Sequence, residues 1–247
     1  MISYAQNQED VLLWRCLKDI KFGHYLDIGA QGPVKDSVTN WFYSEGWRGI
    51  NVEPNSTYYA QLEKHRPGDI NLEFVVSCQN EQVEFYEIEG SGLSTTNFEN
   101  IGHLNIDPER VTKVIKSAIS ASTLLSHYEW DVMHFLKIDV EGMELEVIRN
   151  FDFRKIRPWI ILAEAYCPTT QIPSYGEWEK ILIANNYCFA LDDGLNRYYV
   201  EDNFPNFLEI LKHPVSVFDD FTLSTQLELE KKIFELEKKI FELEKLN

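Results

Sequence analysis

"HYLDIGAQGPVKDSV", residues 24–38, begins as an apolar β-strand and ends in residues that favour a loop. The strand finishes at Asp27, and Gly29 and Gly32 let the backbone turn tightly against a ligand because they carry no side chain. In parallel α/β sheets, ligands bind beyond the carboxyl ends of the strands. The stretch therefore predicts a strand followed by a ligand-binding turn, although a purely structural turn would also explain it when it is taken alone.

The chain up to about residue 222 alternates β-rich runs with amphipathic helical patterns. The expected strands are "YLDI", "GINVE", "LEFVVS", "VEFYEI", "HFLKID", "WIILAEA", "YCFALD" and "RYYVE". Most of them are almost continuously apolar, which is typical of parallel strands covered on both faces, and the last two are close enough in sequence to form an antiparallel edge. The pattern predicts an α/β fold with a doubly wound, mostly parallel sheet, forming one domain over residues 1–222.

The composition limits the classes of protein and partner. With 247 residues, of which 44% are hydrophobic, the chain can bury one sizeable core. Its 23 Lys and Arg against 40 Asp and Glu give a formal net charge of -17, which would repel nucleic acid and anionic lipid. The four cysteines form no C-x-x-C pair, and no apolar run is long enough to cross a bilayer. We therefore expect a cytoplasmic protein with free thiols, no transmembrane segment and no nucleic-acid partner.

The second expected strand also ends in an acid, Glu53, whose carboxylate can accept hydrogen bonds from both hydroxyls of a ribose. A dinucleotide site would require G-x-G-x-x-G after the first strand. This chain has "DIGAQGP" instead, with Asp27 close to where a pyrophosphate would lie. S-adenosylmethionine carries no phosphate, and its ammonium and sulfonium groups suit an acid-lined turn. The two acidic strand ends therefore favour S-adenosylmethionine as the cofactor.

Eight stretches, in order along residues 1–222, resemble those of one known family. They are "SYAQNQEDVLLWRCL", "YLDIGAQGPVKDSVT", "GWRGINVEPNSTYYAQL", "GLSTTN", "FLKIDVEGMELEVI", "IILAEAYCP", "DDGLNRYYV" and "VFDDF". Through them the chain resembles the FkbM-type S-adenosylmethionine-dependent methyltransferases, particularly those met in glycan and polysaccharide gene clusters. The resemblance implies a Rossmann-like class I methyltransferase fold and an O-methyltransferase that acts on a sugar hydroxyl of a glycan or polysaccharide.

The resemblance also implies a set of cofactor-binding residues. By position in the motifs these are Asp27, Gly29, Gln31 and Glu53, with a polar lid from Gln6 and Glu9. Ser77, at the end of the expected strand "LEFVVS", is a further cofactor-binding candidate. Family members often carry Asn where this chain has Gln31.

"FLKIDVEGMELEVI", residues 135–148, predicts a strand that ends at Asp139 and a helix that follows a turn at Gly142. Asp139 is the leading candidate for a general base that takes the proton of the acceptor hydroxyl. Glu141 is a second catalytic candidate, and a cap at the start of the following helix is the alternative for it. His103 lies in an irregular stretch, where it could act as a base or be a solvated surface residue.

A metal site is a further hypothesis for this region. Glu164 ends the strand after the one that ends at Asp139, so the two carboxylates would lie on neighbouring strands. Oxygen ligands there would suit Mg²⁺ or Ca²⁺, but two carboxylates do not establish a metal. The sequence shows no compact cluster of oxygen ligands, which favours a metal-free reaction.

Residues 223–247 carry a seven-residue repeat that predicts a C-terminal coiled coil. Position a holds Ile233 and Ile240, and position d holds Leu229, Leu236 and Leu243. Positions g and e are charged, with Lys232 and Lys239 at g and Glu237 and Glu244 at e. A T-x-x-E capping box from Thr225 to Glu228 is expected to start the helix. Ile at a with Leu at d favours a parallel dimer, and a partner glycan enzyme is the alternative occupant of the seam.

Two classes of function follow from these observations. The first is an enzyme that transfers a methyl group from S-adenosylmethionine to a sugar hydroxyl. The second is a catalytically inactive binding or scaffold module that acts through its coiled coil. The intact acids Asp27, Glu53 and Asp139 favour the enzyme. A nucleotide-sugar dehydrogenase is a third hypothesis, and the missing glycine fingerprint argues against it.

Overall fold

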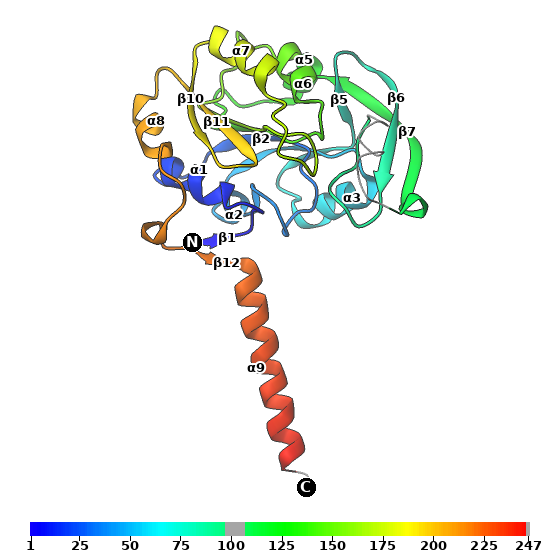
Figure 1. The fold of residues 1–247 in the computed structure, drawn as a ribbon, viewed down its shortest axis with the longest axis vertical. Helices are drawn as coiled ribbons and strands as arrows, with labels where there is room; N and C mark the ends of the chain where they lie inside the picture. The colour runs from blue at the N-terminus through cyan, green and yellow to red at the C-terminus, as the bar shows by residue number, and fades with distance from the viewer. Residues whose placement is uncertain (97–106, 246–247) are drawn as a thin grey trace.

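The computed structural model describes residues 1–96 and 107–245, with a seven-stranded sheet at the centre (Figure 1). From edge to edge the strands are β10 (Tyr187–Asp192), β11 (Asn196–Glu201), β9 (Ile160–Glu164), β8 (Phe135–Ile138), β2 (His24–Ile28), β3 (Arg48–Val52) and β4 (Ile70–Leu72). β11 runs antiparallel to β10 and β9, and the other pairs are parallel. The structure confirms the predicted α/β fold, the mostly parallel sheet and the antiparallel pair at its edge, in a Rossmann-like arrangement. The chain reverses its direction across the sheet beside β2 and β8, which is where such folds bind their ligands.

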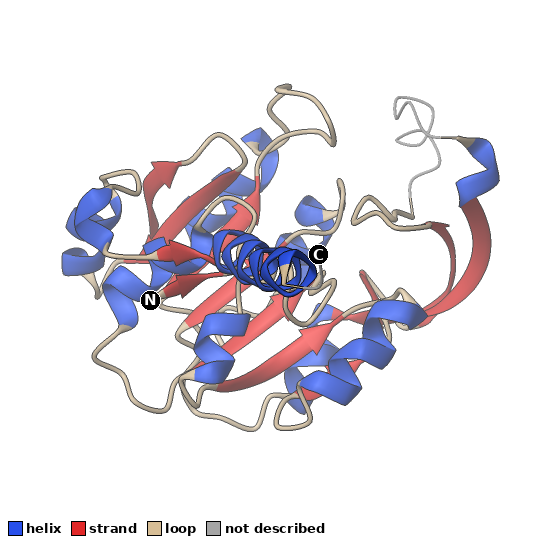
Figure 2. Ribbon diagram, turned by 90° about the horizontal axis from the view of Figure 1, so that it is seen from below, coloured by secondary structure: helices blue, strands red, loops and turns tan. Residues whose placement is uncertain are grey.

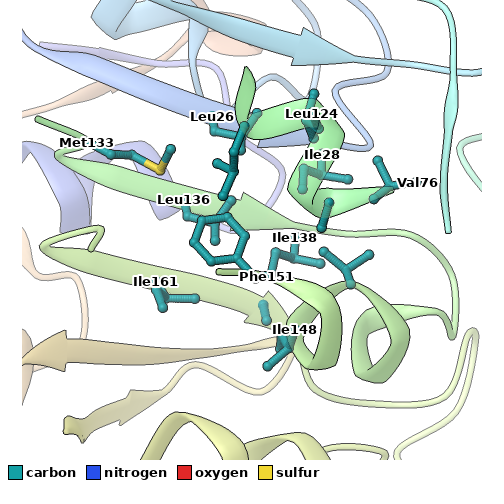
Figure 3. Packing of buried hydrophobic residues seen from close by; sticks show 14 of the residues in the cluster. Leu26, Ile28, Val76, Leu124, Met133, Leu136, Ile138, Ile148, Phe151 and Ile161 are labelled. Atoms are coloured by element: carbon teal, nitrogen blue, oxygen red, sulfur yellow. The ribbon is translucent and has the colours of Figure 1, made fainter. Parts of the chain in front are cut away.

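Helices cover both faces of the sheet, as the apolar strands require (Figures 1 and 2). One face is covered by α1 (Glu9–Leu17), α2 (Asn40–Ser44) and α8 (Pro205–Leu211), and the other by α5 (Ala121–Leu124), α6 (Glu144–Asn150) and α7 (Gly176–Ala184). Successive residues of a strand point to opposite faces of the sheet, so they pack into two separate hydrophobic cores. Leu26 and Ile28 of β2 pack with Leu136 and Ile138 of β8 on the face of α5 and α6 (Figure 3). Tyr25 of β2 packs on the other face.

A second, three-stranded sheet stands beside the main one. It has the order β5-β7-β6, from β5 (Val75–Ser77), β7 (Val111–Ser120) and β6 (Glu81–Ile88). The single strand predicted for "LEFVVS" is wrong, because the chain leaves β4 at Leu72 and enters the second sheet at Val75. Glu73 lies in the segment that connects β4 to β5, and its carboxylate is 3.0 Å from Lys116 Nζ of β7. This ion pair holds the connecting segment against β7.

The remaining elements are short, apart from the last helix. They are β1 (Ile2–Ser3), α3 (Ser56–His65), the 3₁₀ turns Pro108–Arg110, Leu125–His127 and Val217–Asp219, β12 (Thr222–Leu223) and α9 (Ser224–Glu244). β1 pairs with β12 in parallel, so the start of the chain anchors the base of α9, which then extends away from the domain (Figure 1). None of the helices in the described ranges is long and apolar enough to span a membrane.

The start of α9 differs from the sequence expectation. The predicted capping box from Thr225 is wrong: the helix begins at Ser224, and its N-cap, Leu223, makes no side-chain capping hydrogen bond. Pairing of Leu223 with Ser3 holds that residue in an extended conformation, so the helix starts directly after the strand and Thr225 falls inside its first turn. β12 spans residues 222 and 223, the boundary expected between the two parts of the chain.

Candidate active site

The turn after β2 brings the backbone of the first strand against that of β8. Gly29 has φ +81, and a Cβ atom there would lie 1.8 Å from the carbonyl oxygen of Asp139. The Gly29 amide donates to the carbonyl oxygen of Val52 at 2.9 Å, which ties the turn to β3. Only glycine fits this left-handed, close-packed position, so the sequence signal at residue 29 has a local structural cause.

Glu53 joins this turn to the next one through its buried carboxylate. Its Oε2 accepts a hydrogen bond from the Gln31 amide, and its Oε1 accepts one from the Asn55 amide, both at 2.7 Å. Burial raises the pKa of Glu53 to about 7, against the opposing effect of the two backbone donors. Each oxygen retains acceptor capacity, so Glu53 can still receive the hydroxyls of a ligand.

A cavity of about 510 Å³ opens at the carboxyl ends of β2, β3 and β8. This volume lies within the range of small-molecule and cofactor sites. Of the residues predicted from the sequence, seven line it: Gln6, Glu9, Gly29, Gln31, Glu53, Asp139 and Glu141. Apolar surface comes from Ile28, Val52, Phe74, Val76 and Leu93. The site thus joins a polar rim to an apolar wall, as a site for a nucleoside-containing ligand requires.

Three of the other predicted residues, Asp27, Ser77 and Glu164, are not among the lining residues. Asp27 is fully buried and is not among the lining residues; its carboxylate is paired with Lys137 Nζ at 3.2 Å and accepts a hydrogen bond from Thr39 Oγ1 at 3.1 Å. Ser77 is also absent from the lining, and its hydroxyl lies 3.2 Å from a carboxylate oxygen of Glu81. His103 lies outside the described residues. Direct cofactor contacts by Asp27 and Ser77 therefore gain no support from the lining of the cavity.

Lys137 is the site residue that the sequence reasoning missed. Its Nζ donates to the Gly29 carbonyl oxygen at 2.6 Å and lies 3.2 Å from Asp27 and 3.3 Å from Asp139. Burial alone would lower the pKa of Lys137, but the two carboxylates outweigh it and raise that pKa. A lysine inside the apolar run "HFLKID" was the available signal, because a buried lysine requires anionic partners. Lys137 therefore links the strand-end acids to the glycine turn.

Glu9, one of the two residues expected to form a polar lid, belongs to the first helix. Glu9 is buried in the first turn of α1, where its Oε1 accepts from Asn196 Nδ2 at 2.9 Å and its Oε2 from the Asn7 amide at 2.8 Å. Burial raises the pKa of Glu9 to about 7. These bonds connect α1 to β11 and hold this side of the cavity in place.

A cluster of acids follows β8 and β9. Asp139, Glu141 and Glu164 each place a carboxylate oxygen within 4.8 Å of those of the other two. Burial raises the pKa of both Glu141 and Glu164, and the nearby charge of Asp139 raises each further. The helix-cap alternative for Glu141 is wrong, because Glu144 Oε1 accepts the Val140 and Gly142 amides and the N-cap of α6 is Met143.

The loop after β6 forms the remaining side of the cavity. Ser91, Gly92, Leu93, Ser94 and Thr96 contribute to the lining. Thr95 lies between them and is buried, and its hydroxyl donates to the Glu141 carbonyl oxygen at 3.2 Å. This bond connects the loop to the acid cluster, so a ligand in the cavity would contact both.

Comparison with known proteins agrees with this geometry. No curated protein matches the chain. The model of one family, described as the methyltransferase FkbM domain, matches residues 27–189, which is more than half of the chain and includes the glycine turn, Glu53 and the acid cluster. The close-packed turn at Gly29, the buried Glu53 carboxylate and the cavity volume are compatible with the cofactor of such enzymes. The chain therefore belongs to the FkbM methyltransferase family, which implies methyl transfer that depends on S-adenosylmethionine.

Proposed function

We propose that the protein is an O-methyltransferase that transfers the methyl group of S-adenosylmethionine to a sugar hydroxyl of a glycan or polysaccharide. The observation that carries the proposal is one cavity with the buried Glu53 carboxylate on one side and the carboxylate of Asp139 at its rim. The sugar class of the acceptor is supported by the resemblance of the motifs to family members met in glycan gene clusters.

The residues of the cavity suit the parts of the cofactor. The Glu53 carboxylate would accept the ribose hydroxyls, and Val52, Phe74 and Val76 offer apolar surface for the adenine. Gly29 leaves the space in which the backbone can approach the ligand. When bound, the cofactor supplies an electrophilic methyl group on a sulfonium.

Asp139 has the position needed for the acceptor. Its side chain is 39% exposed, and Lys137 Nζ holds one carboxylate oxygen from below at 3.3 Å. A sugar hydroxyl is a poor nucleophile at neutral pH, so its proton must pass to a base or its pKa must be lowered by a cation. The carboxylate of Asp139 can take that proton or hold such a cation.

Calorimetric titration with S-adenosylmethionine tests the cofactor assignment. We expect the wild type to bind it, and Glu53→Gln to bind at least about tenfold more weakly, because hydrogen bonds to a charged group contribute roughly 1.5 to 3 kcal/mol each. Glu45→Gln is the matched control, since Glu45 is exposed at the end of α2 and loses the same charge.

Circular dichroism must show that Glu53→Gln is folded, because Glu53 also accepts two backbone amides. Equal affinity in a folded Glu53→Gln variant would reject Glu53 as the ribose acceptor. A wild type that binds no S-adenosylmethionine would reject the enzymatic function and favour a scaffold protein.

We also propose that α9 joins two copies of the chain as a parallel coiled coil. Its a and d residues are exposed in the single chain: Leu229, Ile233, Leu236, Ile240 and Leu243. Figure 1 shows the helix standing clear of the domain, so a second helix can reach this seam. In a parallel pair, Lys232 at g would face Glu237 at e of the second copy, which is a complementary ion pair.

Leu236→Glu should convert the dimer to a monomer, because it places a charge at the centre of the apolar seam. Lys238→Gln is the control: it changes the net charge equally but lies at position f, outside the seam. Light scattering at micromolar concentrations measures the mass of each, and a variant lacking residues 224–247 should match Leu236→Glu and keep its cofactor affinity. A monomeric wild type would contradict self-association.

A further inference from the structure

Three carboxylates from two neighbouring strand ends meet beside the cavity. β8 and β9 pair in parallel with Ile138 opposite Ala163, so Asp139 and Glu164 follow at adjacent positions. Glu141 has φ +52, a left-handed conformation in the turn after β8, and its carboxylate joins the other two. One oxygen of each residue lies within 4.8 Å of those of the others, a spacing that oxygen ligands around one cation can adopt. We call these three residues the carboxylate cluster.

Glu164 supplies an independent reason to expect a ligand here. Its side chain lies within the cluster, the residue is only 8% exposed, and its Oε2 accepts no hydrogen bond from any residue that the structure describes. A buried carboxylate oxygen without a donor is costly, because it has lost water and gained no replacement. Within the described ranges Glu164 also takes part in no ion pair, since the nearby Lys137 Nζ is engaged by Asp27, Asp139 and the Gly29 carbonyl oxygen.

Charge balance favours a divalent cation over a proton-sharing arrangement of three acids. Three ionised carboxylates carry three negative charges, and the adjacent ammonium of Lys137 is already shared with Asp27, so a doubly charged ion would offset most of the repulsion that remains. Oxygen-only ligands select hard cations such as Mg²⁺ and Mn²⁺.

We propose that Asp139, Glu141 and Glu164 bind one divalent cation of the Mg²⁺ class at the rim of the cavity. Asp139 and Glu141 line the cavity, and the 39% exposure of the Asp139 side chain leaves an open side for a further oxygen ligand. The use of the ion rests on the proposed function: the ion would lower the pKa of an acceptor hydroxyl, whose proton would pass to solvent water. The oxygen would bond to the methyl carbon as the bond between that carbon and the sulfonium sulfur breaks, and S-adenosylhomocysteine would leave. The binding of the ion itself does not depend on that function.

The test uses Mn²⁺ alone, added to the chelator-treated full-length protein without cofactor or acceptor and followed by electron paramagnetic resonance. We expect one tight site per chain, with Mg²⁺ displacing Mn²⁺, and Ca²⁺ as a separate competitor to define the preferred ion. Glu164→Gln should weaken this site at least about tenfold, because it removes a charged ligand. Glu129→Gln is the control of equal charge, since Glu129 is exposed before the amino end of β8. Because the chain has a formal net charge of -17, Mn²⁺ can also bind weakly to its surface, and the control shows how much of the change comes from such binding.

Thermal melting separates loss of the site from loss of the fold. Without metal, Glu164→Gln should melt at or above the wild-type temperature, because it keeps the volume of the side chain and removes a carboxylate that is costly to bury. With Mn²⁺, only the wild type and the control should gain stability. Failure of the wild type to bind Mn²⁺, or equal binding by Glu164→Gln and wild type, would overturn the proposal. Binding of S-adenosylmethionine is measured in a separate titration. A missing ion site would therefore show as loss of Mn²⁺ binding alone, and a missing methyltransferase function as loss of cofactor binding.

Discussion

Gly29→Ala is expected to abolish measurable binding of S-adenosylmethionine. The added Cβ would lie 1.8 Å from the Asp139 carbonyl oxygen, so the turn after β2 would have to separate from β8. The φ of +81 adds a left-handed penalty of roughly 1 to 2 kcal/mol for a residue with a side chain. Because the same turn carries the Gln31 amide that contacts Glu53, its displacement disrupts the cofactor acceptor as well. Calorimetric titration should show at least about a 100-fold loss of affinity, equivalent to roughly 2.7 kcal/mol.

Substitutions at two other glycines separate the two causes of this loss of affinity, the clash of the added Cβ and the left-handed φ. Gly32→Ala, in the same turn, should bind normally, since its Cβ would meet nothing closer than 3.8 Å. Gly46→Ala has φ +92 but open space around the Cβ position, so it measures the conformational penalty without a clash. We expect Gly46→Ala to lower the free energy of unfolding and leave affinity intact. If Gly29→Ala bound the cofactor as well as Gly32→Ala, the close approach to Asp139 would have no part in the site.

The central strands were predictable because they carry apolar residues on both faces of the sheet. Runs such as "YLDI" and "WIILAEA" are apolar on both sides, and the structure buries β2 and β9 between two layers of helices. β7 was missed because none of its first seven residues is buried and the apolar and polar residues of "VTKVIK" do not alternate, so no strand period marks it. The division of "LEFVVS" between two sheets depends on contacts of Glu73 with distant residues, which no local pattern encodes.

The candidate site divides in the same way. Gly29 and Glu53 could be found because each is tied to a local requirement, a left-handed turn and an acid at a strand end. Two members of the carboxylate cluster, Asp139 and Glu164, were expected on neighbouring strands, and β8 and β9 do pair there. The sequence did not place Glu141 with them, because its carboxylate joins the other two through a left-handed residue in the turn after β8. The sequence favoured a metal-free reaction because it showed no compact cluster of oxygen ligands. The structure brings three carboxylates together, which now favours a metal site.

Asp139→Asn is expected to lower turnover by at least about 100-fold while leaving the affinity for S-adenosylmethionine nearly unchanged. Asparagine is close in shape but can neither take a proton at neutral pH nor supply a charged ligand to a cation. General-base assistance alone contributes about 10² to 10⁴-fold in typical enzymes. The fold should survive, because Lys137 keeps its contacts with Asp27 and the Gly29 carbonyl oxygen when Asp139 loses its charge. Transfer of a labelled methyl group to candidate glycans measures the rate.

The matched control is Asp131→Asn, an exposed aspartate before β8 that loses the same charge and should retain full turnover. Normal turnover in Asp139→Asn would remove this residue from the mechanism. Chelation of the wild type then separates the two ways in which Asp139 can act. If the carboxylate cluster holds the ion, activity disappears with chelator and returns with Mg²⁺, and Glu164→Gln loses rate together with Mn²⁺ affinity. If activity persists without metal while Asp139→Asn stays slow, Asp139 acts as the base, and Lys137 at 3.3 Å is the group that holds its carboxylate in position.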